Sequence, residues 1–180
     1  MEGAYLGVPL QYSPSYGYRS AKHPLHSKAS LAITVVGPGN SRDEGKRKII
    51  GEFILGPMKA LNDPDIWITT ALATELESAG YIVRSSKQPP ASKYELRAEI
   101  RHFWIVQSTV GLTSVVRCDL TLGFSLFREG ALITSFESTE NGTVESAIIR
   151  NERQELAEEC LRSCLLQAQP IIDEHIKKEQ

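Results

Sequence analysis

The stretch after the first apolar run has the composition of a phosphate-binding loop but not its spacing. Gly39 is followed by Gly45 and Lys46, and Arg47 comes directly after the lysine. In a P-loop, four residues separate the glycines and a serine or threonine follows the lysine, so that backbone amides surround the phosphate and a hydroxyl holds magnesium. Here five residues separate the glycines and no hydroxyl follows. We therefore predict a solvated basic loop and no bound cofactor.

Histidine and cysteine residues are the next candidates for chemistry, as metal ligands. His23 and His26 lie three residues apart, but a proline stands between them and no carboxylate or cysteine cluster completes a site. Cys118, Cys160 and Cys164 do not follow the paired C-x₂₋₄-C spacing that zinc sites combine with further Cys or His ligands. The sequence therefore predicts no metal site.

The three cysteines are better explained as buried thiols. Cys118 lies on the apolar face of a predicted strand, and Cys160 and Cys164 lie four residues apart on a predicted helix. A disulfide between the two helical cysteines would be strained. A bridge from Cys118 to either of them is possible if the helix packs on the sheet, so the cysteines leave the redox compartment open.

No residue pattern in the chain indicates catalysis. A nucleophilic serine or cysteine needs a base within hydrogen-bond reach, and carboxylate catalysis needs two acids held in a cleft. The acidic residues fall on faces that we predict to be solvated, and there is no G-x-S-x-G motif. We predict that the chain is not an enzyme, and we assign no catalytic residue.

The residues best suited to contact a partner lie in an N-terminal arm and in the basic loop. Residues 1–28 contain prolines and glycines and sustain no helical or strand period, which predicts an extended arm. Its four tyrosines could anchor a partner, or they could lie along the surface of the chain's own domain. The predicted partner-binding residues are Tyr5, Tyr12, Tyr16, Tyr18, Arg42, Lys46, Arg47 and Lys48.

Alternation of apolar and polar side chains predicts the strands that must position these segments. It is sustained over residues 94–101 and again over 112–126, and a period of two places one row of side chains in a core and the other in solvent. Shorter strands are predicted at 31–36 and from residue 81, and a turn at 128–130 leads into a strand at 131–136. We interpret Asn141-Gly142-Thr143, which has the form of a glycosylation acceptor, as a turn after that last strand.

Two helices are predicted. Asp63 and Pro64 are helix-start signals, and Gly80 is the corresponding stop. A second helix, over about 148–178, carries an apolar stripe, and we expect Pro170 to kink or split it. Residues 29–180 are thus predicted to form a single α+β domain, a mostly antiparallel sheet of about four to six strands packed against two main helices.

Composition excludes some classes of partner. With 20 basic and 22 acidic residues the net charge is −2, so bulk electrostatics favour neither nucleic acid nor an anionic membrane. Arg97, Arg101 and Arg117 are predicted on the solvated sheet face, but acidic residues interleave with them, as in ordinary cross-strand pairs. No apolar run approaches the roughly 18 residues that span a bilayer.

The order of these elements resembles small bacterial cell-envelope lipoproteins of the YajG type. The resemblance covers about residues 30–175 and is carried by Leu31 to Val36 with the following loop, by Leu76 to Val83, and by the Leu96 to Ile100 strand. Auxiliary lipoproteins of lipid-transport systems and lipoprotein activators of peptidoglycan synthases look similar at this level. The resemblance implies outer-membrane attachment through an acylated cysteine, with residues 1–28 as linker, although this sequence has no lipobox cysteine.

We therefore expect a non-enzymatic, periplasmic domain, anchored to the outer membrane in its native full-length form. Its expected partner is an envelope protein or a lipid-associated complex, with no nucleic acid, and with membrane contact only through a lipid anchor that this sequence lacks. The alternative is a cytosolic small-ligand-binding protein or enzyme with a pocket between the terminal helix and the sheet.

Overall fold

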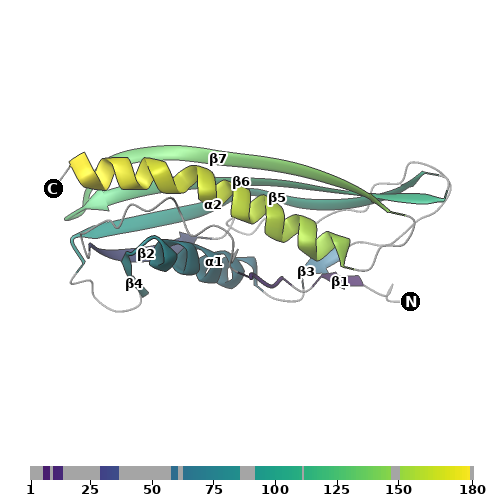
Figure 1. Ribbon diagram of the computed structural model, residues 1–180, viewed down its shortest axis with the longest axis horizontal. Helices are drawn as coiled ribbons and strands as arrows, with labels where there is room; N and C mark the ends of the chain where they lie inside the picture. Colours follow the sequence, from purple (N-terminus) through teal and green to yellow (C-terminus); the bar gives the residue numbers. More distant parts are fainter. Residues whose placement is uncertain are drawn as a thin grey trace.

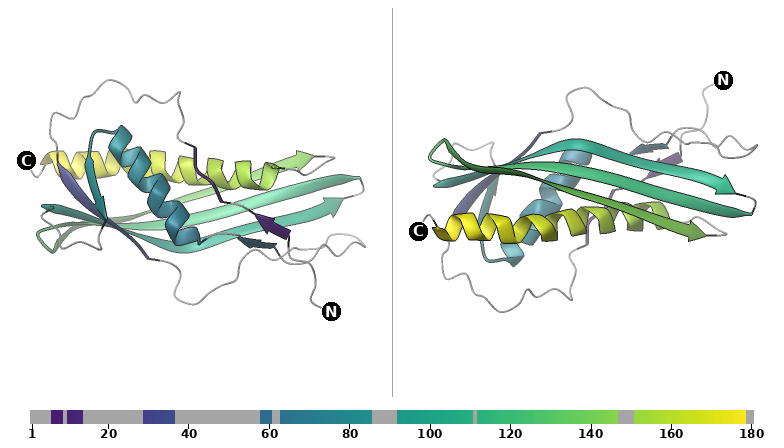
Figure 2. Two further views of the ribbon diagram at one scale, coloured as in Figure 1. Left: turned by 90° about the horizontal axis from the view of Figure 1, so that it is seen from below. Right: turned by 90° about the horizontal axis from the view of Figure 1, so that it is seen from above.

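A five-stranded sheet with two helices on one of its faces forms the fold (Figures 1 and 2). The computed structural model describes residues 6–8, 10–13, 29–36, 58–60, 63–85, 92–110, 112–146 and 151–178. The strands are β2 (Ser30–Val36), β4 (Ile82–Ser85), β5 (Tyr94–Val110), β6 (Thr113–Arg128) and β7 (Ala131–Ser146), and the helices are α1 (Pro64–Ser78) and α2 (Glu152–Lys178). Two short strands, β1 (Leu6–Val8) and β3 (Met58–Ala60), pair separately.

The sheet is mostly antiparallel and has the order β4-β2-β5-β6-β7. The long strands β5, β6 and β7 form two antiparallel pairs, whereas the short strands β4 and β2 add parallel pairs at one side. This arrangement confirms the predicted α+β fold with its two main helices.

Helix α1 begins and ends at the predicted signals. The side chain of Asp63 accepts a hydrogen bond from the backbone N–H of Asp65 at 3.0 Å, and Pro64 occupies the first turn. Gly80 has a φ of 94°, a left-handed conformation that glycine adopts without the strain of a Cβ atom. Strand β4 follows almost at once, as expected.

A β-bulge at Arg101 changes which side chains of β5 face the core. The register with β6 shifts between Ile100 and His102, so one extra residue lies in β5. Buried positions are even-numbered up to Ile100, but Ile105 and Gln107 are buried beyond it. The predicted alternation over 94–101 therefore holds up to the bulge and reverses after it.

Strand β7 is much longer than the predicted 131–136 run, and it contains Asn141-Gly142-Thr143. The interpretation of this tripeptide as a turn is wrong, because its residues pair with Asp119, Cys118 and Arg117 of β6. Gly142 faces α2, and a Cβ atom there would lie 2.6 Å from Cδ1 of Leu156. The glycine therefore permits close approach of helix and sheet.

Helix α2 is a single helix, so the split at Pro170 is wrong, whereas the kink that was its alternative stays a prediction. The proline lies inside the helix with its ring exposed, and the helical run continues to Lys178. The apolar stripe packs on the sheet, and its buried members are Leu156, Ala157, Cys160, Leu161, Cys164, Leu165, Ala168, Ile172 and Ile176. No helix of the described part of the chain has the length and hydropathy to cross a membrane.

All three cysteines are buried free thiols, in agreement with the first of the two sequence interpretations. Cys160 Sγ lies 3.9 Å from the carbonyl oxygen of Cys118, and Cys164 Sγ lies 3.7 Å from that of Ser138. The hydrogen bond with Cys160, together with burial, raises the pKa of the Cys118 thiol. Helix α2 thus packs on β6 and β7 with thiols at the contact.

Charged and polar side chains cover the sheet face opposite the helices. Arg97 pairs with Glu95 at 2.8 Å, and the guanidinium of Arg97 lies 4.4 Å from the ring centroid of Phe127. Arg101 pairs with Glu99 and with Glu137 of β7. Only the Arg101–Glu137 pair joins two strands, as predicted for the interleaved charges, whereas Arg97–Glu95 and Arg101–Glu99 are pairs within β5.

Candidate functional site

Tyr12 is the one predicted partner-binding residue that falls within the described part of the chain. Tyr5, Tyr16 and Tyr18 lie outside the described residues, as do all four basic candidates, Arg42, Lys46, Arg47 and Lys48. The structure therefore gives the surroundings of Tyr12 and leaves the other seven residues as predictions.

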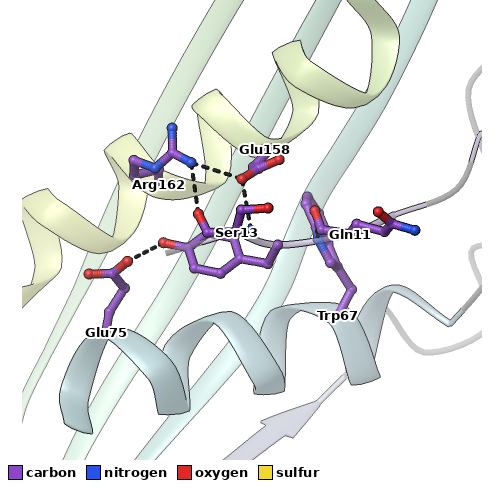
Figure 3. A network of polar contacts seen from close by, with 7 residues as sticks. Gln11, Ser13, Trp67, Glu75, Glu158 and Arg162 are labelled. Atoms are coloured by element: carbon purple, nitrogen blue, oxygen red, sulfur yellow. Dashed lines mark hydrogen bonds and ion pairs between the residues drawn. The ribbon is translucent and has the colours of Figure 1, made fainter. Parts of the chain in front are cut away.

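Residues 10–13, here called the docked segment, lie between α1 and α2 (Figure 3). Leu10 is only 3% exposed and belongs to the hydrophobic core, and Tyr12 packs against the same core. The intervening side chain of Gln11 and the following one of Ser13 are exposed. Alternate side chains thus point into the domain, as in an extended peptide lying on a surface.

Three side chains from the two helices bind the backbone of the docked segment. Trp67 Nε1 of α1 donates to the carbonyl oxygen of Gln11 at 3.0 Å. On α2, Glu158 Oε1 accepts from the backbone N–H of Ser13 at 2.8 Å, and Arg162 Nη2 donates to the carbonyl oxygen of Ser13 at 3.0 Å. These contacts recognise main-chain groups, which any residue except proline at the N–H position supplies.

The side chain of Tyr12 makes the contact that depends on residue type. Its hydroxyl donates a hydrogen bond to the carboxylate of Glu75 on α1, and the guanidinium of Arg162 lies 5.9 Å from its ring centroid. Burial, reinforced by the bond to Glu75, raises the pKa of Tyr12 above its usual range. Tyr12 therefore stays a neutral hydrogen-bond donor at physiological pH.

Glu158 and Arg162 form the α2 half of this site. They pair with each other at 2.8 Å across one helical turn, and their side chains are only 13% and 28% exposed. Arg162 Nε is buried and has no hydrogen-bond partner among the described residues. We call Trp67, Glu75, Glu158 and Arg162 together the docking site.

The sequence did not identify the docking site. The sequence predicts Glu158, like the other acidic residues, on a solvated face, and Ser13 lies 145 residues before it. The one available signal was the Glu158/Arg162 spacing of four, which also occurs on ordinary solvated helices. The docked segment lies in the region predicted as an arm, and Tyr12 lies along the domain's own surface, one of the two alternatives left open for the tyrosines.

The docking site is a set of hydrogen-bonding groups for a peptide. Among the described residues, no group of three or more His, Cys, Asp or Glu side chains could hold a metal ion. The side chains of the docking site instead bind one backbone N–H, two backbone carbonyl oxygens and one phenol hydroxyl of the docked segment. The arrangement can therefore bind an extended segment with a tyrosine.

Comparison with known proteins shows the fold. No family model and no curated protein matches the sequence. A protein of family DUF330 from Xanthomonas campestris has a similar structure, with a TM-score of 0.61 at 13% identity, covering 97% of this chain and 99% of that one.

Two further structures are similar at lower scores. A putative lipoprotein from Caulobacter crescentus CB15 has a TM-score of 0.47 at 11% identity, covering 82% of this chain and 92% of that one. A minor lipoprotein from Acinetobacter baumannii has a TM-score of 0.43 at 14% identity, covering 81% and 92%. The chain therefore shares the DUF330 protein's fold, and similar structures include bacterial lipoproteins, whereas the YajG-type assignment stays a prediction.

Proposed function

We propose that this chain is a non-enzymatic, lipoprotein-like domain of the bacterial cell envelope that binds an envelope protein or a lipid-associated complex. The observation that carries this proposal is the docked segment, because α1 and α2 already hold an extended peptide through its backbone. A fold that binds a peptide in this way is suited to holding a partner. The lipoproteins among the similar structures suggest the envelope as its location.

The N-terminal arm and the basic loop are the proposed contact elements. Tyr5 precedes the docked segment by five residues in sequence, and Tyr16 and Tyr18 follow Ser13 by three and five. Because Leu10 and Tyr12 are fixed on the domain, a partner that binds these three tyrosines is brought near α1 and α2. Arg42, Lys46, Arg47 and Lys48 would supply positive charge for an acidic partner surface.

Point variants test the contact elements more sharply than a truncation does. Deletion of residues 1–28 would also remove the docked segment, with its buried Leu10. We would change Tyr5, Tyr16 and Tyr18 together to Ala in one variant, and Arg42, Lys46, Arg47 and Lys48 together to Gln in another. Each is expected to lose partner capture by cross-linking in the producing cells at an unchanged melting temperature.

The matched control removes positive charge elsewhere. Lys177 and Lys178, at the exposed end of α2, are changed to Gln, and capture should persist. Equal capture by both test variants and by the wild type would contradict the proposed role of the arm and the loop.

Location is tested separately by fractionating the producing cells and measuring the intact mass of the protein. A membrane-associated form with an acylated cysteine upstream of Glu2 is expected. A form beginning at Met1 in the soluble fraction would contradict an envelope location and favour the small-ligand alternative, which a thermal-shift screen then examines.

A further inference from the structure

We propose that the docking site also binds an extended segment of a partner protein. This segment carries a leucine and a tyrosine two residues apart and replaces the docked segment. The inference rests on the proposed binding function and names the chemistry of the partner. It is carried by the contacts around residues 10–13 (Figure 3).

The first step is that most hydrogen bonds at the site do not depend on the sequence of the bound segment. Trp67, Glu158 and Arg162 bind two carbonyl oxygens and one N–H of the main chain. A second peptide in the same extended conformation presents the same groups at the same spacing. The backbone contacts therefore transfer from the chain's own segment to that of a partner.

The second step is that two positions specify the occupant. Leu10 is buried in the hydrophobic core, and the Tyr12 hydroxyl meets the Glu75 carboxylate. The side chains of Gln11 and Ser13 are exposed, so these positions accept any residue, apart from proline at the second of them, whose N–H Glu158 binds. The pattern required of a partner is therefore Leu-x-Tyr.

Two prolines flank the docked segment and bias its backbone conformation. Pro9 precedes Leu10, and Pro14 follows Ser13. A residue before proline is restricted to extended conformations, so Ser13 is biased towards the form that the site binds. A partner segment with proline after the fourth position would lose less conformational entropy on binding.

The third step is that the chain's own segment leaves the site incompletely used. Arg162 Nε is buried without a hydrogen-bond partner among the described residues, although Nη2 contacts both Glu158 and Ser13. A buried donor without an acceptor is costly. A partner segment that places an oxygen there gains a bond that residues 10–13 do not make.

The covalent connection to the domain is what retains the chain's own segment. Residues 14–29 link it to β2, and a tether of this kind gives an effective concentration on the order of millimolar. A free peptide therefore competes poorly with it. A partner already bound to the arm or the basic loop would have a similar advantage, which couples this site to the proposed function.

The test uses the full chain with its own segment weakened. The probe is a fluorescein-labelled peptide with the sequence of residues 8–15, and its binding is measured by fluorescence anisotropy. Because Tyr12→Ala removes the bond to Glu75, the variant should bind the probe at least about tenfold more tightly than the wild type does. Circular dichroism checks that the variant is folded.

Peptide variants separate the two kinds of position. Replacing the probe's tyrosine with Ala should weaken binding at least about tenfold, whereas replacing its glutamine, whose counterpart Gln11 is exposed, should leave binding unchanged. Equal binding of all three probes would overturn the Leu-x-Tyr pattern. Absence of binding to the folded variant would overturn the proposal.

A second measurement needs no variant. A probe with a benzophenone at the glutamine position is cross-linked to the wild-type protein at high peptide concentration, and adducts are expected on α1 or α2. Adducts confined to the opposite sheet face would overturn the proposal. Light scattering of the protein without probe tests whether a second copy of the chain occupies the site. Dimers that form with increasing concentration, and that Tyr12→Ala abolishes, would identify a second copy as the occupant and would overturn the proposal of a partner segment.

These measurements use purified protein and a synthetic peptide. A negative result therefore removes the peptide site while leaving capture through Tyr5, Tyr16, Tyr18 and the basic loop as it stands. Unchanged cellular capture by the two test variants, together with positive peptide binding, would remove only the role of the arm and the basic loop.

Discussion

The hydroxyl of Tyr12 donates a hydrogen bond to the carboxylate of Glu75, which joins the N-terminal segment to a helix 63 residues further along the chain. Tyr12→Phe removes this bond and keeps the ring, so it should lower the free energy of unfolding by about 0.5–1.5 kcal/mol. Urea unfolding measures the loss. Glu75→Gln keeps an oxygen acceptor and should cost less; an unchanged midpoint for Tyr12→Phe would show that the bond contributes nothing.

Gly142 of β7 faces α2 at a place where a side chain would have no room. An alanine Cβ there would lie 2.6 Å from Leu156 Cδ1 and 3.2 Å from Cys160 Sγ, so Gly142→Ala should destabilise the fold by roughly 1–3 kcal/mol. Gly123→Ala is the matched control, because its Cβ would meet the flexible Arg101 side chain, which can move away on the solvated face. Equal losses in the two variants would contradict close packing at Gly142.

Pro170 lies within α2 and cannot donate a backbone hydrogen bond to the carbonyl of Leu166. Its ring is exposed, so Pro170→Ala should restore the bond without opening a cavity and should raise stability by about 1–3 kcal/mol. Chemical unfolding measures the gain, and Gln169→Ala on the same helix should change little. A loss of stability on replacing the proline would be the opposite of this expectation.

Burial raises the pKa of Cys164 to about 11, from a usual value of about 9. The folded state therefore keeps this proton at pH values where the unfolded state releases it. The resulting stabilisation is fully present below pH 9 and is lost as the pH rises towards 11. Between these values, wild-type stability should fall more steeply with pH than that of Cys164→Ala. Parallel pH profiles would show that Cys164 does not contribute.

The same burial should protect all three thiols from reagents. Cys118, Cys160 and Cys164 are at most 4% exposed. A water-soluble maleimide at pH 7 should label none of them in the folded protein and all three after unfolding, as counted by intact mass. Rapid labelling of the folded protein would mean that α2 opens from the sheet far more often than its packing implies.

The sequence by itself determined the type and order of most elements, because their signals are local. Asp63, Pro64 and Gly80 act on neighbouring backbone groups, and a period of two over 112–126 requires only that one side of a strand be buried. The α+β class follows from such signals. They also explain the buried cysteines, which lie on the apolar face of β6 and in the stripe of α2.

Tertiary structure decided what depends on residues distant in sequence. Gly142 resembles a turn residue until α2 lies against it, and the bulge at Arg101 becomes visible only in the register with β6. The docking site is the clearest case, since Trp67, Glu75, Glu158 and Arg162 come together around residues 10–13 only after both helices have packed on one sheet face. Local preferences set conformation along the chain, whereas burial and hydrogen bonding between distant segments set which side chains meet.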